Sequence, residues 1–121
     1  MRRTTSCFAL GALLVGALSV FTPGQTAGGL VLLEYLQGTA GAAETYERTY
    51  RVHTAGVYIK NDGITPIAIQ FGEGEVDTAT GAGGGIVKAQ EGAWFPVRTA
   101  RIALRTPEGQ AAFRMWVWGR P

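Results

Sequence analysis

The sequence has very few of the side chains on which enzymes most often depend. Its 121 residues include one histidine, His53, and one cysteine, Cys7, while serine occurs only as Ser6 and Ser19. A Ser-His-Asp arrangement would need a serine near His53, and both serines lie in the N-terminal apolar stretch. One histidine and one cysteine are too few ligands for a zinc site. The sequence therefore predicts a protein that is not an enzyme and that binds neither a metal ion nor a cofactor.

A strong charge of one sign is also lacking. Eleven basic residues stand against nine acidic ones, which gives a net charge of +2 and a pI of about 9.0. This mild balance gives no reason to expect a specific nucleic-acid partner. Glu73, Glu75 and Asp77 alternate in a glycine-rich stretch, but the closing acidic residue of a calcium loop does not follow at the required distance. We interpret them as solvated loop charges.

The N-terminal segment, residues 1–27, is dominated by a long hydrophobic stretch. Arg2 and Arg3 begin the segment, and no charged residue follows until Glu34. The uncharged residues 4–22 come close to the roughly 20 that are needed to cross a hydrocarbon core. The basic start also fits a secretory signal, although the small-x-small cleavage pattern is missing where it should follow. Three interpretations stay open: a retained membrane anchor, a cleaved signal, and a strand or helix that is buried against a partner.

The rest of the chain has the features of a β protein. Glycine occurs 18 times and disfavours helix. Hydrophobic residues alternate with others in short runs, as at Ile67 and Ile69, and turn signals such as Asn61-Asp62-Gly63 separate the runs. We expect a mainly β protein in which residues 47–121 form a small antiparallel β-sandwich or jelly-roll-like module. Residues 28–46 are predicted to be a linker that contains one short apolar strand.

Two further features are expected in this module. Residues 72–85 form a long glycine-rich loop, and such loops are often functional or mobile. Trp94 and Phe95 are adjacent, and successive side chains of a strand point to opposite faces. One of these two rings is therefore expected in the core and the other outside.

The end of the sequence predicts a surface for partners. Residues 100–106 and 110–118 are expected to pair as a hairpin, with Phe113, Met115 and Val117 facing the core. The alternate residues would then face outward, where tryptophan and arginine are typical of binding hot spots. The alternative is that both faces of the strand are buried. The predicted interface residues are Trp116, Trp118, Arg114, Trp94, Arg101 and Arg105.

Two stretches carry a resemblance to known proteins. NDGITPIAIQF at 61–71 and EGAWFPVRTARIALRTPEGQAAFRMWVW at 91–118 resemble small virion proteins of bacteriophages. In many of these, a strand of the type N-x-G-x-x-P-I-x-I precedes a loop, a turn with G-x-W/F, a strand with I-x-L and a closing strand. A membrane segment ahead of such a module looks like the spike-associated or vertex proteins of phages with an internal lipid membrane. The resemblance implies no catalytic residue.

These patterns favour a non-enzymatic structural protein of a virion, in the capsid or associated with its membrane. Its expected partners are other virion proteins, in a homo-oligomer or a multi-copy assembly, and the N-terminal segment would contact lipid. The alternative is an exported module of the bacterial cell surface or periplasm, whose glycine-rich loop and aromatic face bind a glycan or a protein.

Overall fold

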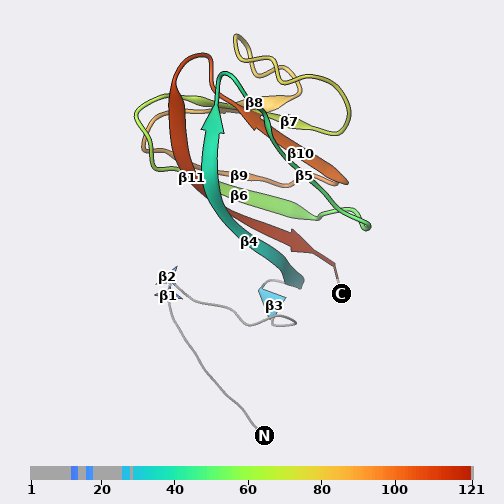
Figure 1. The fold of residues 1–121 in the computed structure, drawn as a ribbon. Coiled ribbons are helices and arrows are strands. Elements are labelled where there is room, and N and C mark those ends of the chain that lie inside the picture. Colours follow the sequence, from blue (N-terminus) through green and yellow to red (C-terminus); the bar gives the residue numbers. More distant parts are fainter. Residues whose placement is uncertain (1–11, 14–15, 18–25, 28, 121) are drawn as a thin grey trace, which may run out of the picture.

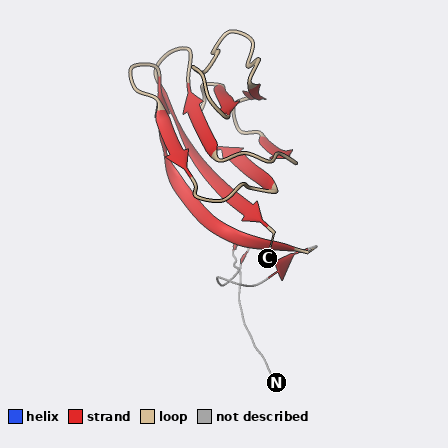
Figure 2. Cartoon of the chain, turned by 90° about the vertical axis from the view of Figure 1, so that its right-hand side faces the viewer, coloured by secondary structure: helices blue, strands red, loops and turns tan. Residues whose placement is uncertain are grey.

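The chain folds into two antiparallel sheets that enclose one core (Figure 1). The computed structural model describes residues 12–13, 16–17, 26–27 and 29–120, and in this part of the chain the regular elements are all β-strands (Figure 2). The prediction of a mainly β protein is confirmed. The described residues contain no helix of the length and apolarity that a membrane crossing requires. The predicted hydrophobic segment 1–27 lies outside the described residues, apart from three two-residue strands.

The first sheet has five strands in the order β3-β4-β11-β6-β9. All its neighbouring strands are antiparallel, and the long β11 pairs along its length with β4 on one side and β6 on the other. Its strands are β3 (Thr26–Ala27), β4 (Leu30–Gly41), β6 (Gly56–Asn61), β9 (Gly92–Phe95) and β11 (Gln110–Gly119).

The second sheet has four strands in the order β5-β10-β7-β8, and these are also antiparallel. They are β5 (Tyr46–Thr49), β7 (Ile67–Phe71), β8 (Gly84–Val87) and β10 (Arg101–Arg105). Two further short strands, β1 (Ala12–Leu13) and β2 (Gly16–Ala17), pair only with each other.

The core lies between the two sheets and follows the alternation of the strands. Phe113, Met115 and Val117 of β11 are at most 1% exposed, which confirms the face that their spacing predicted. The second sheet contributes buried side chains from β7 and β10, among them Ile69 and Leu104. Removing this apolar surface from water is the main stabilising contribution that such a small domain has.

Residues 28–46 were predicted to be a linker with one short apolar strand, and they contain a longer strand, β4, that pairs with β11 from Gln110 to Gly119. Small residues such as those at 38–43 (GTAGAA) are typical of a flexible connector. In the structure Gly38 is small for a packing reason: a Cβ there would lie 3.2 Å from the Tyr46 ring and 3.4 Å from the Phe113 ring. The described two-sheet domain therefore includes β4 and does not begin at residue 47.

The predicted closing hairpin is wrong. Residues 106–109 do form a turn, in which the Thr106 hydroxyl donates to the Gly109 carbonyl over 3.1 Å. However, β10 belongs to the second sheet and β11 to the first, so the two strands do not pair with each other. An apolar alternation shows which side of a strand is buried, but it does not show which strand is its neighbour.

Candidate functional site

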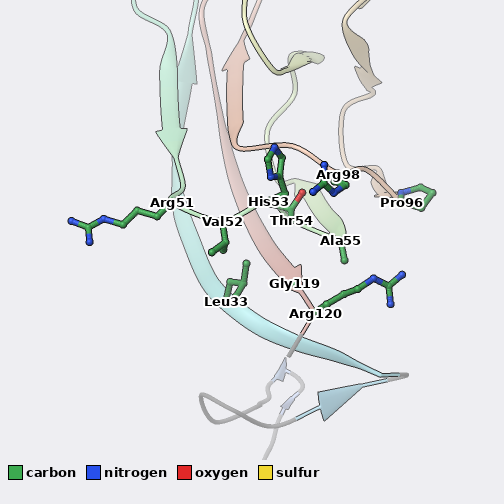
Figure 3. A pocket seen from close by; sticks show the side chains of 10 residues that line it. All are labelled: Leu33, Arg51, Val52, His53, Thr54, Ala55, Pro96, Arg98, Gly119 and Arg120. Carbon is green, nitrogen blue, oxygen red and sulfur yellow. The ribbon is translucent and has the colours of Figure 1, made fainter.

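Two surface features of the described residues are candidates for function: a cavity at one end of the two-sheet domain and an aromatic face on the first sheet. The cavity has a volume of about 650 Å³ (Figure 3). Its lining residues are Leu33, Arg51, Val52, His53, Thr54, Ala55, Pro96, Arg98, Gly119 and Arg120. None of them is a carboxylate, so the single histidine has no acidic side chain beside it in the cavity to orient it as a base.

The aromatic face is built by the register of four neighbouring strands. Trp116 of β11 lies directly opposite Tyr35 of β4 and, on its other side, opposite Tyr58 of β6. Tyr58 in turn lies opposite Trp94 of β9. The four rings therefore form one row across the sheet, on the side away from the core, and we refer to them as the aromatic row.

Three rings of the row are in contact, and the row is open to solvent. The ring centroids of Trp116 lie 5.0 Å from Tyr35 and 5.6 Å from Tyr58, with tilted planes. The exposed fractions are 43% for Tyr35, 36% for Tyr58 and 47% for Trp94, and Trp116 is half-buried between its neighbours. Cross-strand aromatic pairs stabilise a sheet. Four adjoining rings that face solvent are also unusual for a surface without a partner.

Two glycines make room for the rings of Tyr58 and Trp94. A Cβ at Gly92 would lie 2.1 Å from the Tyr58 hydroxyl oxygen, and a Cβ at Gly56 would lie 2.1 Å from the Trp94 ring. Each ring therefore lies across the neighbouring strand, in the space that a side chain at the glycine position would fill. A side chain at either glycine would therefore displace the ring that lies over it.

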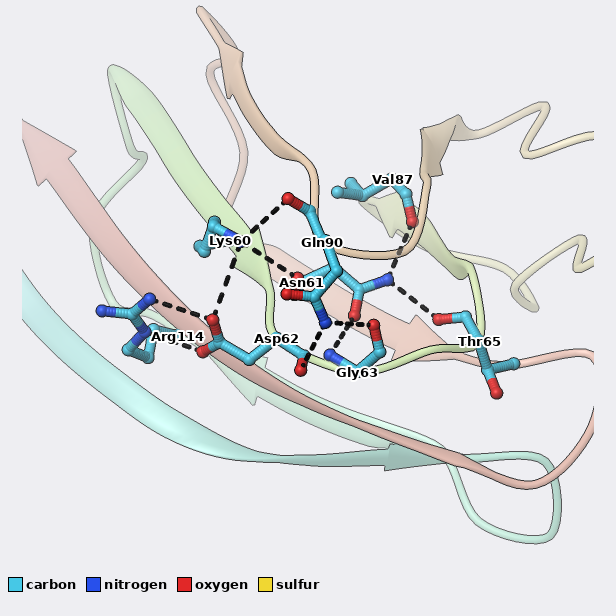
Figure 4. Close-up of polar contacts among 8 residues, drawn as sticks. All are labelled: Lys60, Asn61, Asp62, Gly63, Thr65, Val87, Gln90 and Arg114. Atoms are coloured by element: carbon cyan, nitrogen blue, oxygen red, sulfur yellow. Dashed lines mark hydrogen bonds and ion pairs between the residues drawn. The ribbon is translucent and has the colours of Figure 1, made fainter.

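A polar row borders the aromatic row. Gln37, Arg114 and Lys60 lie opposite one another in register on β4, β11 and β6. The Arg114 guanidinium donates two hydrogen bonds, of 2.7 and 2.9 Å, to the Asp62 carboxylate (Figure 4). Its carbon Cζ lies 5.9 Å from the centroid of the Trp116 ring, within the range of a cation–π contact. The Tyr35 hydroxyl donates to the Gln37 side chain over 2.9 Å.

The electrostatics of this border are governed by Asp62. Its hydrogen bonds from Arg114, together with the charge of Lys60 at 3.8 Å, hold the pKa of its carboxyl below the usual value of 3.8. The same pairing raises the pKa of Arg114. Because both charges are used within the chain, the border offers a partner an oriented planar guanidinium and the amide of Gln37, with little free charge.

A hydrogen-bond network anchors the loop from which Asp62 projects (Figure 4). The Asn61 side chain is fully buried, and it donates to the carbonyls of Thr65 and Val87 over 2.9 and 3.1 Å. It also accepts from the Gly63 N–H over 2.8 Å. Asn61 thus links the first sheet, the β6–β7 connection and the end of β8. It therefore keeps Asp62 in position beside Arg114.

The structure brings together three of the six predicted interface residues. Trp116 and Trp94 belong to the aromatic row, and Arg114 borders it. The adjacent rings of Trp94 and Phe95 lie on opposite faces of the strand, as expected. Trp94 is exposed, while Phe95 packs against the core, with its ring centroid 5.2 Å from that of Phe71. The sequence interpretation did not include Tyr35 and Tyr58. The sequence feature that could have identified them is the alternation of the strands, because each tyrosine lies between two residues that face the core side.

The other three predicted residues lie elsewhere. Trp118 is only 8% exposed, so its indole is not the open surface that we expected. Arg101 and Arg105 are in β10 of the second sheet, where their side chains hold loops. The Arg101 guanidinium donates to the carbonyls of Gly72 and Gly74 over 2.6 and 3.0 Å and pairs with Glu47. Arg105 donates to the Ala42 carbonyl over 2.7 and 3.0 Å.

The acidic loop 72–83 is organised by its own hydrogen bonds. Asp77 accepts from the N–H groups of Ala79 and Thr80 over 3.0 and 3.1 Å and from the Thr80 hydroxyl over 2.7 Å, which lowers the pKa of its carboxyl. Among the described residues, no group of three or more histidine, cysteine or carboxylate side chains is placed to hold a metal ion.

Comparison with known proteins adds no family to this description. No family model matches the chain, and neither a curated protein nor a solved structure matches it. The aromatic row and its border can stack on flat or apolar groups, donate hydrogen bonds from a guanidinium, and release ordered water when they are covered.

Proposed function

We propose that the protein is a non-enzymatic structural component of a virion, and that it packs against neighbouring subunits through the outer face of its first sheet. The observation that carries this proposal is the aromatic row. Tyrosine, tryptophan and arginine are the residues most enriched at the centres of protein interfaces. Here four aromatic residues are aligned on neighbouring strands, with Arg114 beside Trp116.

The connectivity supports the same proposal. From β4 to β11 the chain crosses between the sheets at every connection except β7–β8, and β4-β11-β6-β9 lie against β5-β10-β7-β8. We infer from this order an eight-stranded jelly roll made of two Greek keys, to which β3 adds at one edge. Viral capsid domains are among the proteins that use this architecture. The resemblance of 61–71 and 91–118 to small phage virion proteins points the same way.

The proposed mechanism is burial of the aromatic row at a repeated contact. Full burial of a large apolar side chain contributes roughly 1.5–3 kcal/mol. These rings are already partly covered, so each adds only a fraction of that, and together they suffice for a weak individual contact. Many copies in one shell then hold each subunit firmly, because the later contacts form within the same assembly. The expected partners are other virion proteins or further copies of this chain.

Particle purification tests this proposal. Virions are purified from cells that produce the protein, and its amount per particle is measured by quantitative mass spectrometry. We expect the wild type at a fixed multi-copy ratio, and the Tyr58→Ala/Trp116→Ala double variant in the unassembled fraction with its fold intact. Ile86→Ala is the matched control, because Ile86 is 38% exposed on the outer face of the second sheet. Recovery of the wild type only outside particles would contradict the proposal.

A second candidate is an exported carbohydrate-binding module. It is favoured by one observation, the placement of the Gln37 amide and the Arg114 guanidinium beside exposed rings, since sugars combine stacking faces with hydroxyl groups. Jelly rolls also include lectin domains. Binding of soluble oligosaccharides, lost in Tyr58→Ala and kept in Ile86→Ala, would favour this candidate over the first.

A further inference from the structure

The cavity at the end of the two-sheet domain has a chemistry different from that of the aromatic row. Three of its lining residues, Arg51, Arg98 and Arg120, are exposed and make no ion pair or hydrogen bond with another described residue. Elsewhere in the described chain, Arg48, Arg101 and Arg114 are all paired with carboxylates. Arg105 has no carboxylate partner but donates to the Ala42 carbonyl. Among the described residues, the arginines without any such contact are therefore gathered at this end.

Apolar side chains lie between these cations. Val52 is 58% exposed and Leu33 is 37% exposed, and both line the cavity. In Figure 3, Arg51 and Arg120 extend away from each other on either side of Leu33 and Val52, while Arg98 lies beside His53. A site for a single small anion would need guanidinium groups that converge on one point. Cations that are spread around an apolar centre instead suit an extended anionic surface.

An irregularity in β4 places Leu33 in this position. Val117 pairs with Glu34 and Trp118 pairs with Leu32, so Leu33 is the extra residue of a β-bulge. Bulges redirect side chains. A Cβ at Gly119 would lie 2.7 Å from the Leu33 side chain, so the leucine lies over the end of β11 at the cavity.

The nearby carboxylate of Glu34 does not neutralise the positive charge of these arginines. Glu34 accepts hydrogen bonds from Arg48 and, over 2.9 Å, from the Tyr50 hydroxyl. The Arg48 contact holds the pKa of the Glu34 carboxyl below its usual value of 4.5. Its charge is thus neutralised within the chain, between β4 and the end of β5.

The sequence that precedes this end of the domain is uncharged. β3 pairs with Leu30 and Val31 of β4, so the chain joins the domain beside the cavity. Between Arg3 and Glu34 no residue is charged, and most are apolar or small. Stable attachment to a bilayer generally combines one apolar insertion with a basic patch that contacts anionic headgroups. The cavity residues lie where that second contribution would be needed.

We propose that the end of the domain formed by Arg51, Arg98, Arg120, Leu33 and Val52 is a docking surface for an anionic lipid membrane. The guanidinium groups would contact lipid phosphates, while Leu33 and Val52 would enter the interfacial region. This surface is separate from the aromatic row, which remains free for neighbouring subunits. Loss of membrane binding and loss of subunit contacts can therefore be tested separately, with variants of different residues.

Vesicle binding of the full chain tests this surface. The probes are phosphatidylcholine vesicles with and without phosphatidylglycerol, and binding is measured by co-sedimentation. We expect the wild type to prefer the anionic vesicles, and Arg51→Gln/Arg98→Gln/Arg120→Gln to lose this preference by on the order of 10–100-fold, while binding to neutral vesicles is unchanged. The residues are exposed, so the thermal unfolding temperature should stay the same.

The control variant is Lys88→Glu/Gln110→Glu, which changes the net charge by the same amount at exposed positions outside the cavity. It should keep most of the anionic preference. Equal losses in the control and the triple variant would overturn the proposal, because net charge and not this surface would then be responsible. So would equal binding of the wild type to neutral and anionic vesicles. Binding to soluble polyglutamate as tight as to anionic vesicles would also overturn it, in favour of an acidic protein partner.

Discussion

The indole of Trp94 lies over Gly56 on the adjacent strand, in the space that a side chain at position 56 would occupy. A Cβ at Gly56 would be 2.1 Å from the ring, far inside van der Waals contact. An aromatic residue that covers a glycine on a neighbouring strand shields the exposed backbone there and holds the register. The same relationship joins Tyr58 to Gly92, so the positions of these two rings depend on the two glycines.

Gly56→Ala should therefore displace the Trp94 ring. We expect it to lower the free energy of unfolding by roughly 1–3 kcal/mol, because the new methyl group overlaps the indole. In a Trp94→Ala background the same substitution should cost much less. Urea unfolding of the four proteins of this cycle measures the coupling between the two positions. An equal cost in both backgrounds would contradict the contact.

Asn61 should be more important for stability than its neighbours in the β6–β7 connection. Asn61→Ala removes the buried donor to the Thr65 and Val87 carbonyls and the acceptor for the Gly63 N–H. We expect a loss of about 2–3 kcal/mol in urea unfolding, because buried polar groups are left unsatisfied. The exposed Thr39→Ala should change stability by less than about 0.5 kcal/mol. A similar small effect at Asn61 would show that water or another group replaces its side chain.

The domain should lose stability in acid through Glu34 and Asp62. Hydrogen bonds from Arg48 and Arg114 hold the pKa of these carboxyls below the usual values of 4.5 and 3.8 in the folded chain. The unfolded chain therefore binds protons at a higher pH than the folded chain does. The stability that the two groups contribute is fully present above the pKa values of the unfolded chain. It is lost as the pH falls through the lower pKa values that the groups have in the folded chain.

Asp62→Asn should consequently flatten the fall of the unfolding free energy below about pH 4.5, relative to the wild type. The control is Glu108→Gln, which removes an exposed carboxylate that has no ion pair among the described residues. Chemical unfolding at a series of pH values makes this comparison. Identical slopes for Asp62→Asn and the wild type would exclude Asp62 as a source of the acid sensitivity.

Arg101 should control the protease resistance of loop 72–83. Its guanidinium donates to the carbonyls of Gly72 and Gly74, so Arg101→Gln should release the start of the loop. We expect faster cleavage within 72–83 under native conditions, measured by mass spectrometry of the first fragments. Arg51→Gln, which removes an exposed arginine without a described partner, is the control. Equal cleavage rates in the two variants would show that the loop is held by other contacts.

The sequence predicted the faces of the strands better than their neighbours. Alternation correctly placed Phe113, Met115 and Val117 in the core, and the adjacent rings Trp94 and Phe95 on opposite faces. These predictions depend only on the two-residue period of a strand. Pairing depends on contacts between distant residues, and nothing local indicated that β10 and β11 lie in different sheets. The predicted hairpin failed for this reason.

The candidate site was partly predictable in the same sense. Trp116 and Arg114 were found because one strand's outward residues can be listed from its sequence. The row as a whole requires the register of β4, β11, β6 and β9, which brings Tyr35 and Tyr58 beside Trp116. Arg101 and Arg105 have the same outward spacing, but they belong to the other sheet. Composition alone could not separate these two groups of arginines.

Hydroxyl-radical footprinting of assembled particles would show whether the aromatic row is covered by a neighbouring subunit. Oxidation of Tyr35, Tyr58, Trp94 and Trp116 is quantified by mass spectrometry in the free protein and in purified virions, with Ile86 on the outer face of the second sheet as the reference. We expect strong protection of all four rings on assembly and little change at Ile86. Equal oxidation of the four rings in both states would contradict the role of the aromatic row as the contact surface.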